Sequence, residues 1–498
     1  MSLVSTKIIA MWMSRVSVFL CWALLPCSLA SLSQCPLNGN YSVLDGSPNI
    51  TAELGPLLST NARIYLPGSE AFETATTRWS VLLQPAIAVV VMPAVEEDVV
   101  QTVKYANKHG IDFLAIGGGH GVTSALSKVQ NGIGIWMRGM KEITIAESGS
   151  QATIQAGVEA GEVTKILWDQ GKQAMSTACD CVGFISTILG GGHGWLQGRH
   201  GLVTDNLISA RVVLANSTAV TVSDKENPDL FWALRGAGHN FGILTSVEYR
   251  IFDQTPEEAS WAYEEYIFSH DKLEELYSFV NQLVRSPTNA IPPIILFWII
   301  WQGREIPSQY VQPIRALGPE SIKTDVIPIT KLNSVAGAAY DTPNCGNGAS
   351  TMLFPIGVPS YNLKALRKAF DVYSSFPEWL NNSFVLLEGY STEAVHRVPA
   401  ESTAFPDRFN ELLLAPLMIF AADSGPERYE IAQNYAEKIR EALVEGNSGV
   451  LHAYVNYAHG NEELKSVYGY EEWRLEKLRR LKKEWDPEGK FGFYVPIE

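Results

Sequence analysis

The sequence predicts an α+β fold built from two dissimilar halves. Residues 86–116 follow the pattern strand, helix, strand and lead into a run of glycines, which is typical of a unit that ends in a ligand-binding loop. Residues 254–445 instead alternate helical and strand-like stretches without a comparable glycine cluster. The chain has 498 residues, of which 46% are hydrophobic and 18% charged, so it can bury a large core in several domain-sized units.

The first 30 residues have the layout of a secretory signal peptide. Lys7 and Arg15 precede an apolar run over residues 16–29, and small side chains follow it, so we expect cleavage after Ala30. The run is shorter than the roughly 20 residues that a membrane span needs, and Pro26 interrupts it, so we expect no stable membrane span. The sequence therefore predicts a secreted protein or one of the secretory pathway.

Export would turn the Asn-x-Ser/Thr sequons into usable glycosylation sites, and these begin at Asn40, Asn49, Asn216 and Asn381. The cysteines beyond the expected signal peptide are Cys35, Cys179, Cys181 and Cys345. They are too few to build a disulfide scaffold in so long a chain, and the pairing of Cys35 and Cys345 stays open.

The net charge limits the possible partners. The chain has 53 acidic and 38 basic residues, a formal charge of -15. An acidic surface repels phosphate backbones, so we expect no nucleic-acid partner. We expect no metal site, and the sequence leaves the oligomeric state open.

The first strong unit follows an irregular N-terminal segment, residues 31–75. Residues 86–92 form an apolar, β-branched run of strand length that ends at Pro93. Three acids at 96–98 favour a helix start, and Gly110 favours its end. Residues 111–116 then form a second strand that leads directly into Gly117-Gly118-Gly119-His120-Gly121.

A second glycine cluster, Gly190-Gly191-Gly192-His193-Gly194, follows the apolar stretch 185–189. Beyond it we expect strands over 208–214, 219–222 and 243–251, with a short helix over 229–234. Residues 76–253 therefore form one predicted unit.

The remaining chain forms a different unit. We expect helices over 271–285 and 362–374 and strands over 294–301 and 384–387. Residues 254–445 are interpreted as a domain that covers the substrate, and residues 446–498 as a terminal module with a charged helix over 471–484.

Glycine loops after strands expose backbone N–H groups that can bind phosphate, and two such loops suggest a dinucleotide. Neither cluster has the nicotinamide fingerprint G-x-G-x-x-G at the start of a clear helix. Tight turns without a ligand are the alternative explanation.

The order of the motifs adds a family resemblance. The strings AIGGGHG, VGFISTILGGGHGWLQGRHGLVTDN, NPDLFWALRGAGHNFGILTSVEY and AYVNYAHG resemble, in this order, the berberine-bridge-enzyme-like FAD-linked oxidoreductases, fungal branch, of the vanillyl-alcohol oxidase superfamily. The resemblance implies FAD as cofactor. It also implies a two-part PCMH-type FAD-binding domain, a substrate domain whose antiparallel sheet is covered by helices, and a C-terminal module that returns to the FAD domain.

The same resemblance assigns cofactor-binding residues. His120 would bond covalently to the flavin 8-methyl carbon, although a simple hydrogen bond to phosphate is the alternative. Cys179 would form a second bond at flavin C6, but Asp180 replaces the proline usual in that motif, and Cys181 is a competing thiol. The remaining expected cofactor residues are Ile116, Gly117, Gly118, Gly119 and Gly121 at the pyrophosphate, Gly183, Gly190, Gly191 and Gly192 along the flavin, and Gly242 and Ile243 on the adenine side.

Catalysis needs a base beside the flavin. The resemblance places Tyr454 and Tyr457 there, on a strand-like segment, although a tyrosine with a pKa of about 10 is a poor base and both could be core aromatics. Several relatives carry a Glu or Gln after an AFPHR-type motif. Here AFPDR, residues 404–408, is followed by the apolar stretch 412–419, so that role is vacant or has moved. Other polar residues near the loops are interpreted as structural or cofactor-shell residues: Arg78, His193, His200, Asp205 and His239.

The predicted function is a FAD-dependent oxidase that acts on a small organic metabolite in fungal secondary metabolism, with O2 as electron acceptor. A secreted carbohydrate oxidase is the alternative, for which Trp261, Trp298 and Trp301 could provide sugar platforms. A flavin-binding protein without turnover is an alternative of another class.

Overall fold

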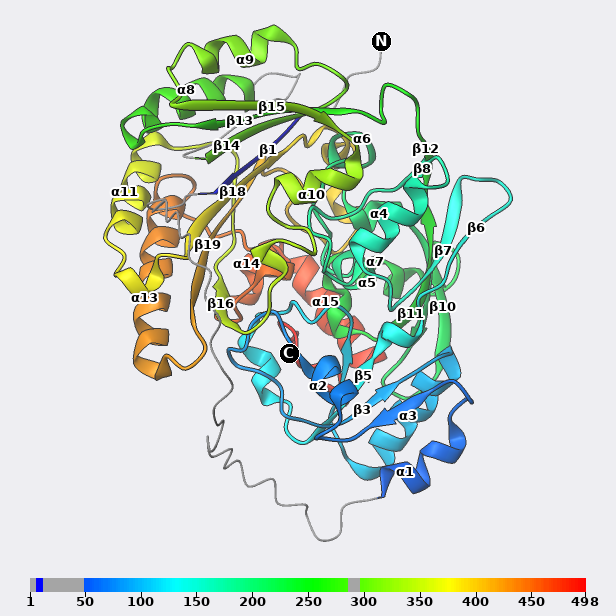
Figure 1. Ribbon diagram of the computed structural model, residues 1–498. Coiled ribbons are helices and arrows are strands. Elements are labelled where there is room, and N and C mark those ends of the chain that lie inside the picture. The colour runs from blue at the N-terminus through cyan, green and yellow to red at the C-terminus, as the bar shows by residue number, and fades with distance from the viewer. Residues whose placement is uncertain (1–5, 12–48, 285–295) are drawn as a thin grey trace, which may run out of the picture.

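The computed structural model describes residues 6–11, 49–284 and 296–498, which form an α+β protein with two unlike halves (Figure 1). One half contains a four-stranded and a five-stranded sheet, and the other contains an eight-stranded antiparallel sheet covered by helices. This arrangement confirms the predicted fold class.

The four-stranded sheet has the order β2-β3-β5-β4, with β3, β5 and β4 parallel. Its strands are β2 (Arg63–Tyr65), β3 (Ile87–Met92), β5 (Gly132–Trp136) and β4 (Phe113–Ile116). The helix α3 (Glu96–His109) connects β3 to β4: it begins with three acids, as its dipole favours, and ends at Gly110 with a φ of 64°. Its apolar face, with Val99, Val103 and Ala106, is buried.

The segment expected to be irregular, residues 31–75, contains ordered elements where it is described. These are α1 (Ile50–Glu53), β2 and α2 (Glu70–Thr76). Their sequences are too short to show a periodic pattern, and β2 is recognisable only from its pairing with β3.

The five-stranded sheet is antiparallel and has the order β10-β9-β11-β7-β6. Its strands are β6 (Ile143–Ile145), β7 (Gln151–Gln155), β9 (Leu207–Val213), β10 (Ala219–Ser223) and β11 (Ile243–Arg250). Besides α1, α2 and α3, the described part of this half contains the helices α4 (Ala160–Trp168), α5 (Phe184–Ile188), α6 (Gln197–His200) and α7 (Pro228–Ala237). A small ribbon joins β8 (Lys172–Gln173) to β12 (Phe252–Asp253).

The eight-stranded sheet has the order β15-β13-β14-β1-β18-β19-β16, and β17 pairs with β19. Its strands are β1 (Thr6–Met11), β13 (Trp261–Ile267), β14 (Leu296–Gln302), β15 (Ser321–Ile327), β16 (Ala349–Leu353), β17 (Ile356–Val358), β18 (Phe384–Tyr390) and β19 (Leu412–Ala421). The helices of this half are α8 (Leu273–Val284), α9 (Ser308–Arg315), α10 (Leu332–Val335), α11 (Leu363–Ser374), α12 (Glu393–His396) and α13 (Gly425–Glu445).

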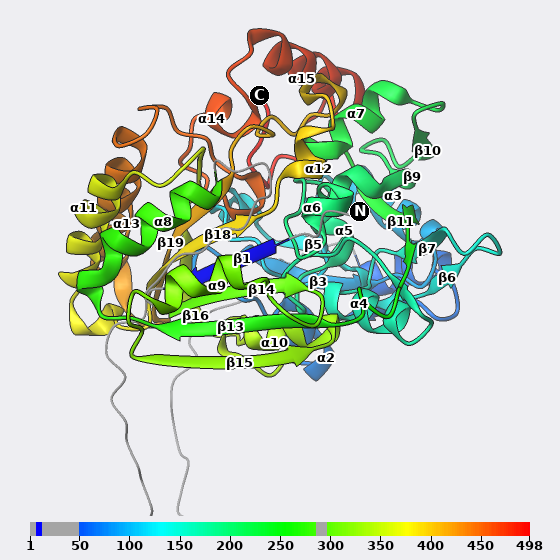
Figure 2. The same cartoon turned by 90° about the horizontal axis from the view of Figure 1, so that it is seen from above.

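Alternating residues of β18 face opposite sides of this sheet. Val385 and Leu387 belong to a buried core that also contains Leu366 of α11 and Ile439 of α13. The helices α8, α11 and α13 lie on the outer side, away from the other half (Figure 2). The inner side of the sheet is therefore left to face the two smaller sheets.

β1 lies between β14 and β18, and its residues belong to the expected signal peptide. A chain cleaved after Ala30 would lack this strand, so β14 would keep only β13 and β18 only β19 as a neighbour. Residues 12–48, which include Cys35 and Asn40, lie outside the described residues.

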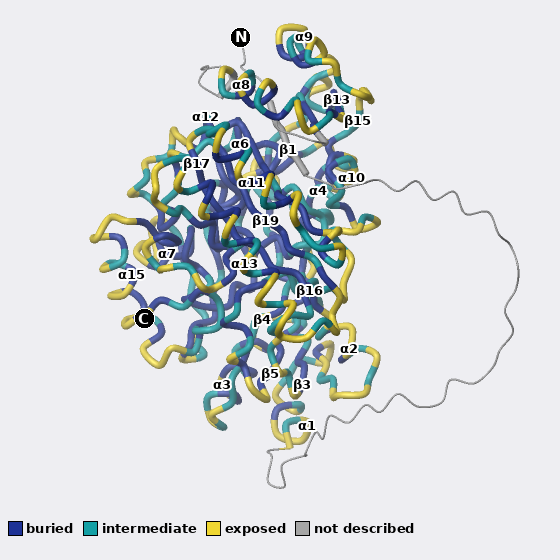
Figure 3. The backbone as a smooth tube through the Cα atoms, turned by 90° about the vertical axis from the view of Figure 1, so that its left-hand side faces the viewer, coloured by how far each residue is buried: buried dark blue, intermediate teal, exposed yellow. Residues whose placement is uncertain are grey.

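The C-terminal segment packs on the half with the smaller sheets, where α15 (Glu472–Trp485) contacts α7, and the short α14 (Leu464–Tyr468) precedes it. Lys482 donates hydrogen bonds to the Asn240 carbonyl (2.8 Å) and to Asp486 (2.6 Å), all of them buried. Burial is continuous through the middle of the molecule (Figure 3). The expected boundaries at residues 76, 254 and 446 stay predictions. Within the described ranges, no helix combines the length and the apolar character that crossing a membrane requires.

Candidate active site

Two cavities meet between the halves of the molecule. The first, of about 180 Å³, follows the glycine loop after β4, and the second, of about 220 Å³, reaches the inner face of the eight-stranded sheet. They adjoin each other, because the same residues line both: Gly118, His120, Gly121, Gly183, Ser186, His239 and Tyr494.

The loop after β4 presents backbone to the first cavity. A side chain at Gly118 would be impossible, because its Cβ would lie 2.5 Å from the Cys181 carbonyl oxygen and 2.7 Å from the Gly183 nitrogen. Gly119 has a φ of 72°, which favours glycine. Both glycines are therefore required by the close approach and the turn that bring the loop to the cavity. The backbone N–H groups of such a glycine loop suit a phosphate.

Arg78 provides a buried positive charge at this cavity, which Lys490 also lines. The Arg78 side chain lines the cavity and is 7% exposed, and its Nη2 donates to the Gly121 carbonyl at 2.7 Å. Among the described residues no carboxylate forms an ion pair with it. Burial lowers the pKa of Arg78 to about 10, so it remains charged at neutral pH. A buried cation without a protein anion fits an anionic ligand such as a pyrophosphate.

His120 lies where the two cavities join. Its ring stacks on Trp79 with centroids 5.3 Å apart. Burial, together with the nearby Arg78 charge, lowers the pKa of His120 to about 4. The imidazole is therefore neutral at physiological pH, as a nitrogen nucleophile must be.

The predicted cofactor residues separate into two groups. Those that line the first cavity are Ile116, Gly117, Gly118, Gly119, Gly121, Gly183, Gly242 and Ile243. Gly190, Gly191 and Gly192 line neither cavity, which differs from the expectation. Side chains there would collide with Asn456, Phe405 and Val203, respectively, so these glycines allow the chain to pack tightly behind the cavity wall.

Cys179 lines the second cavity, whereas Cys181 forms a disulfide with Cys345. Among the described cysteines, Cys179 is therefore the free one. Burial raises the pKa of its thiol to about 12, so the thiol is protonated at neutral pH. The pairing left open by the sequence is thus settled for Cys345.

Tyr454 and Tyr457 both line the second cavity, with ring centroids 5.1 Å apart. The expected strand is wrong: Val455–Tyr457 form a 3-10 turn, which turns both rings towards one cavity. The Tyr454 hydroxyl accepts hydrogen bonds from the Gly192 nitrogen (3.0 Å) and Asn456 Nδ2 (2.8 Å). Burial raises the pKa of both tyrosines, which disfavours tyrosinate.

A carboxylate that the sequence did not reveal completes the site. Glu388 of β18 is 4% exposed and lines the second cavity. Its Oε2 accepts a hydrogen bond from the Tyr457 hydroxyl at 3.2 Å, and its Oε1 accepts one from the Tyr390 hydroxyl at 2.8 Å. Burial raises the pKa of Glu388 to about 7. Among the residues that line the second cavity, Glu388 is thus the group that can exchange a proton near neutral pH.

The position of Glu388 explains why the stretch after residues 404–408 lacks the Glu or Gln found in several relatives. It pairs in register with Leu413, inside the apolar stretch 412–419, so the acid lies on the strand next to the expected one. The only sequence signal is a lone acid at the end of the apolar run FVLLEGY.

The part of the second cavity beyond His120 is apolar on the sheet side. Its walls there are Leu353, Phe384, Leu386 and Leu417, with Trp79 from the other half. No lysine or arginine lines it among the described residues. The tryptophans expected as sugar platforms, Trp261, Trp298 and Trp301, are not among its lining residues.

The remaining polar residues named from the sequence lie at different places. His193 and His239 line the second cavity, and burial lowers the pKa of each to about 4. His200 instead stacks on Phe252, and Asp205 forms a buried ion pair with Arg408 at 2.7 Å. The last two therefore have a structural role.

The first cavity thus suits a pyrophosphate, and the second suits the oxidation of an organic molecule. The two together define a flavin-dependent oxidoreductase. Residues 87–223 match the FAD binding domain family. The chain is 41% identical over 470 residues to the FAD-linked oxidoreductase chyH of Penicillium rubens, covering 89% of this chain and 93% of that one. It is 36% identical to the FAD-linked oxidoreductase anuG of Penicillium roqueforti, covering 90% and 92%. The chain belongs to this family of FAD-linked oxidoreductases, and FAD is its cofactor.

Solved structures show the same fold. A chitooligosaccharide oxidase superposes with a TM-score of 0.75 at 21% identity, covering 89% of this chain and 99% of that chain. The glucooligosaccharide oxidase of Acremonium strictum superposes with a TM-score of 0.76 at 22% identity, covering 90% and 98%. These likenesses confirm the PCMH-type architecture expected from the sequence.

Proposed function

We propose that the protein oxidises a small, uncharged and largely apolar alcohol and passes the electrons to O2. The observation that supports this most directly is the Glu388–Tyr457 pair, which faces an apolar wall in the same cavity as His120 and Cys179. FAD in the two cavities supplies a two-electron acceptor for hydride. The chain must then bind the alcohol and accept its hydroxyl proton.

Glu388 is proposed as the final proton acceptor, with Tyr457 as the relay. The substrate hydroxyl gives its proton to the Tyr457 oxygen while Tyr457 passes its own proton to Glu388 Oε2. This order follows from the acidities, since burial raises the pKa of Tyr457 far above that of Glu388. The Tyr390 hydroxyl holds the other carboxylate oxygen and so orients the acceptor.

We propose that His120 and Cys179 both bond covalently to the flavin. A glucooligosaccharide oxidase structure at 23% identity is described as carrying a 6-S-cysteinyl, 8α-N1-histidyl FAD. In this chain a neutral imidazole and a free thiol line the same cavity, which supports the same double linkage.

The cavity wall favours an apolar metabolite over an oligosaccharide. Leu353, Phe384, Leu386 and Leu417 offer a sugar no hydrogen bonds, and burying unpaired hydroxyls is costly. Carbohydrate oxidases among the structural neighbours share the fold at low identity. We therefore propose a substrate from fungal secondary metabolism, because the relatives with 36–41% identity are fungal proteins.

We also propose that the protein passes through the secretory pathway and carries glycans. Three of the four sequons are described, and their asparagines are exposed: Asn49, Asn216 and Asn381. The Asn216 side chain lies in the turn between β9 and β10, where its Oδ1 accepts a hydrogen bond from the Thr218 nitrogen.

The test uses purified holoprotein and matched panels of aromatic or alicyclic alcohols and oligosaccharides. Flavin reduction is followed without oxygen, and peroxide is measured in air. We expect reduction by members of the first panel and peroxide in equal amount to product. Reduction by the oligosaccharides alone would contradict the proposed substrate class, and flavin reduction without peroxide would contradict O2 as the acceptor.

A further inference from the structure

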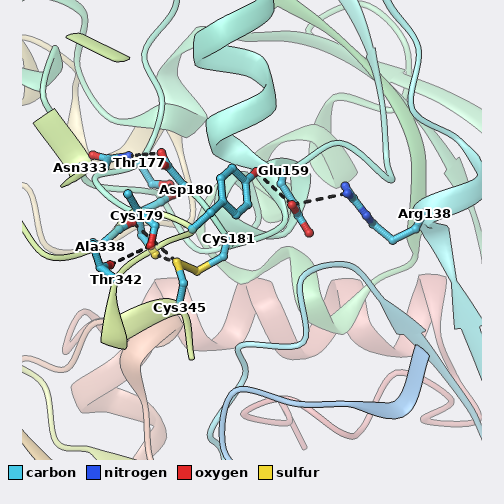
Figure 4. Close-up of a disulfide and its surroundings, with 12 residues drawn as sticks. Arg138, Glu159, Thr177, Cys179, Asp180, Cys181, Asn333, Ala338, Thr342 and Cys345 are labelled. Carbon is cyan, nitrogen blue, oxygen red and sulfur yellow. Dashed lines mark hydrogen bonds and ion pairs between the residues drawn. A yellow bond between two sulfur atoms is a disulfide. The ribbon is translucent and has the colours of Figure 1, made fainter. Parts of the chain in front are cut away.

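The loop that carries Cys179 is bonded to residues 333–345, which belong to the half with the eight-stranded sheet (Figure 4). The Asp180 nitrogen donates to the Ala338 carbonyl at 2.9 Å, and Asn333 Nδ2 donates to Asp180 Oδ1 at 2.7 Å. The next residue, Cys181, is bonded to Cys345, 164 positions away. Both residues that follow Cys179 are therefore held by the segment 333–345.

The free thiol lies unusually close to this disulfide. The sulfur atoms of Cys179 and Cys181 are 3.6 Å apart, and the two residues are separated only by Asp180. A reduced Cys181 would therefore be within reach of Cys179 as a disulfide partner. Any such bond would consume the free thiol of Cys179, which lines the cavity.

We propose that Cys345 protects Cys179: by holding Cys181 in a disulfide, it keeps Cys179 as a free thiol that faces the cavity. What Cys179 then does, namely bond to the flavin, rests on the proposed function; the protection itself does not. In this role Cys345 is a positioning residue, because it acts on the cavity through Cys181.

Burial keeps the protected state from rearranging. Thiol–disulfide exchange needs a thiolate as the attacking group. Burial raises the pKa of Cys179 to about 12, so very little thiolate is present to attack Cys181 and release Cys345. Proximity alone therefore does not scramble the native pairing.

Loss of Cys345 leaves Cys181 without its native disulfide partner. Cys181 then carries a free thiol, and two S–H bonds, on Cys179 and Cys181, can break and one S–S bond can form. The two electrons and two protons pass to oxidised glutathione, which becomes two molecules of reduced glutathione. The scarcity of Cys179 thiolate makes this step slow, so it is followed over a long incubation. This outcome depends on the presence of Cys181, so removing Cys181 as well restores the free thiol.

The experiment compares the full-length wild type with Cys345→Ala and with the double variant Cys181→Ala/Cys345→Ala. Each is incubated with oxidised glutathione, alkylated under denaturing conditions and mapped by mass spectrometry without reduction. The Cys179 peptide is recorded as flavin adduct, alkylated thiol, mixed disulfide with glutathione or disulfide with Cys181.

We expect Cys179 of the wild type to be a flavin adduct or an alkylated thiol. In Cys345→Ala the disulfide with Cys181 should rise at least about tenfold. In the double variant, which lacks the same native disulfide, Cys179 should return to the wild-type distribution. This variant also controls for lost stability, with circular dichroism as a check on folding.

Three results would overturn the protection. The first is that Cys345→Ala does not form the disulfide between Cys179 and Cys181. The second is that Cys179 of the double variant is neither a flavin adduct nor a free thiol. The third is that Cys179 of the wild type is already in a disulfide. A wild type with Cys179 free but never bonded to flavin contradicts the proposed second linkage alone. The two claims thus fail by different observations.

Discussion

The Tyr457 hydroxyl donates a hydrogen bond to Glu388 across 3.2 Å, although the two residues are 69 positions apart in the chain. Glu388 belongs to the eight-stranded sheet, and Tyr457 belongs to the segment that returns to the FAD-binding half. The base of the proposed reaction is therefore assembled only when both halves and the C-terminal segment are in place.

The pH dependence of substrate oxidation should follow Glu388. Because burial raises its pKa to about 7, the carboxylate that accepts the proton is present above pH 7 and is lost as the pH falls through 7. The rate constant of flavin reduction should thus fall about tenfold for each pH unit below that value. Stopped-flow reduction between pH 5 and 9 measures this profile. A rate that rises towards low pH would contradict the Glu388 carboxylate as the proton acceptor.

Replacing His120 should change how FAD is held. In His120→Ala the neutral imidazole at the junction of the cavities is absent, so at most one covalent bond remains, through Cys179. Intact mass and flavin retained after acid precipitation measure the linkage. His109→Ala is the matched control, because His109 lies on α3 beside Glu53. Wild-type protein that releases all its flavin on denaturation would contradict both linkages.

Replacing Arg78 should weaken flavin binding. Arg78→Met removes the buried charge assigned to the pyrophosphate, and a hydrogen bond to a charged group contributes about 1.5–3 kcal/mol. We therefore expect roughly tenfold to hundredfold weaker FAD binding, measured by titration in a His120→Ala/Cys179→Ala background. Arg63→Met, which removes an arginine bonded to the Thr60 and Ala62 carbonyls, is the control. Equal affinity in both variants would show that Arg78 does not face the phosphates.

The start of the mature chain is a separate prediction. If residues 1–30 are a signal peptide, secreted protein should begin at Ser31 and therefore lack β1. N-terminal sequencing of protein from the culture medium measures this directly. A secreted chain that still contains Thr6–Met11 would contradict cleavage and would retain β1 as described here.

Local signals predicted much of the FAD-binding half. Residues close together in the sequence indicate the strand β3, the acidic start of α3 and its end at Gly110. The loop that carries His120 is indicated in the same way. The glycines 190–192 show the limit of such signals. Close packing against Asn456 and Phe405 requires glycine as strictly as a ligand does, and the sequence does not distinguish these causes.

The long-range features could not be predicted. The Cys181–Cys345 bond joins positions 164 apart, and several pairings of the cysteines were possible. Glu388 lies in an apolar strand whose side chains alternate between core and cavity, so its role depends on the face that it occupies and on Tyr457.

The central claim is that Glu388 accepts the substrate proton, and Glu388→Gln tests it most directly. The amide keeps the size of the side chain but cannot accept the proton, whereas Glu264→Gln alters a buried glutamate of the same sheet that pairs with Arg315 outside the cavity. A positioned base contributes roughly 100- to 10,000-fold, so anaerobic stopped-flow should show flavin reduction slowed at least about 100-fold in Glu388→Gln. Tyr457→Phe should slow it at least about tenfold, because it interrupts the relay. Unchanged flavin reduction in Glu388→Gln, with full flavin content and a wild-type rate in Glu264→Gln, would contradict the account.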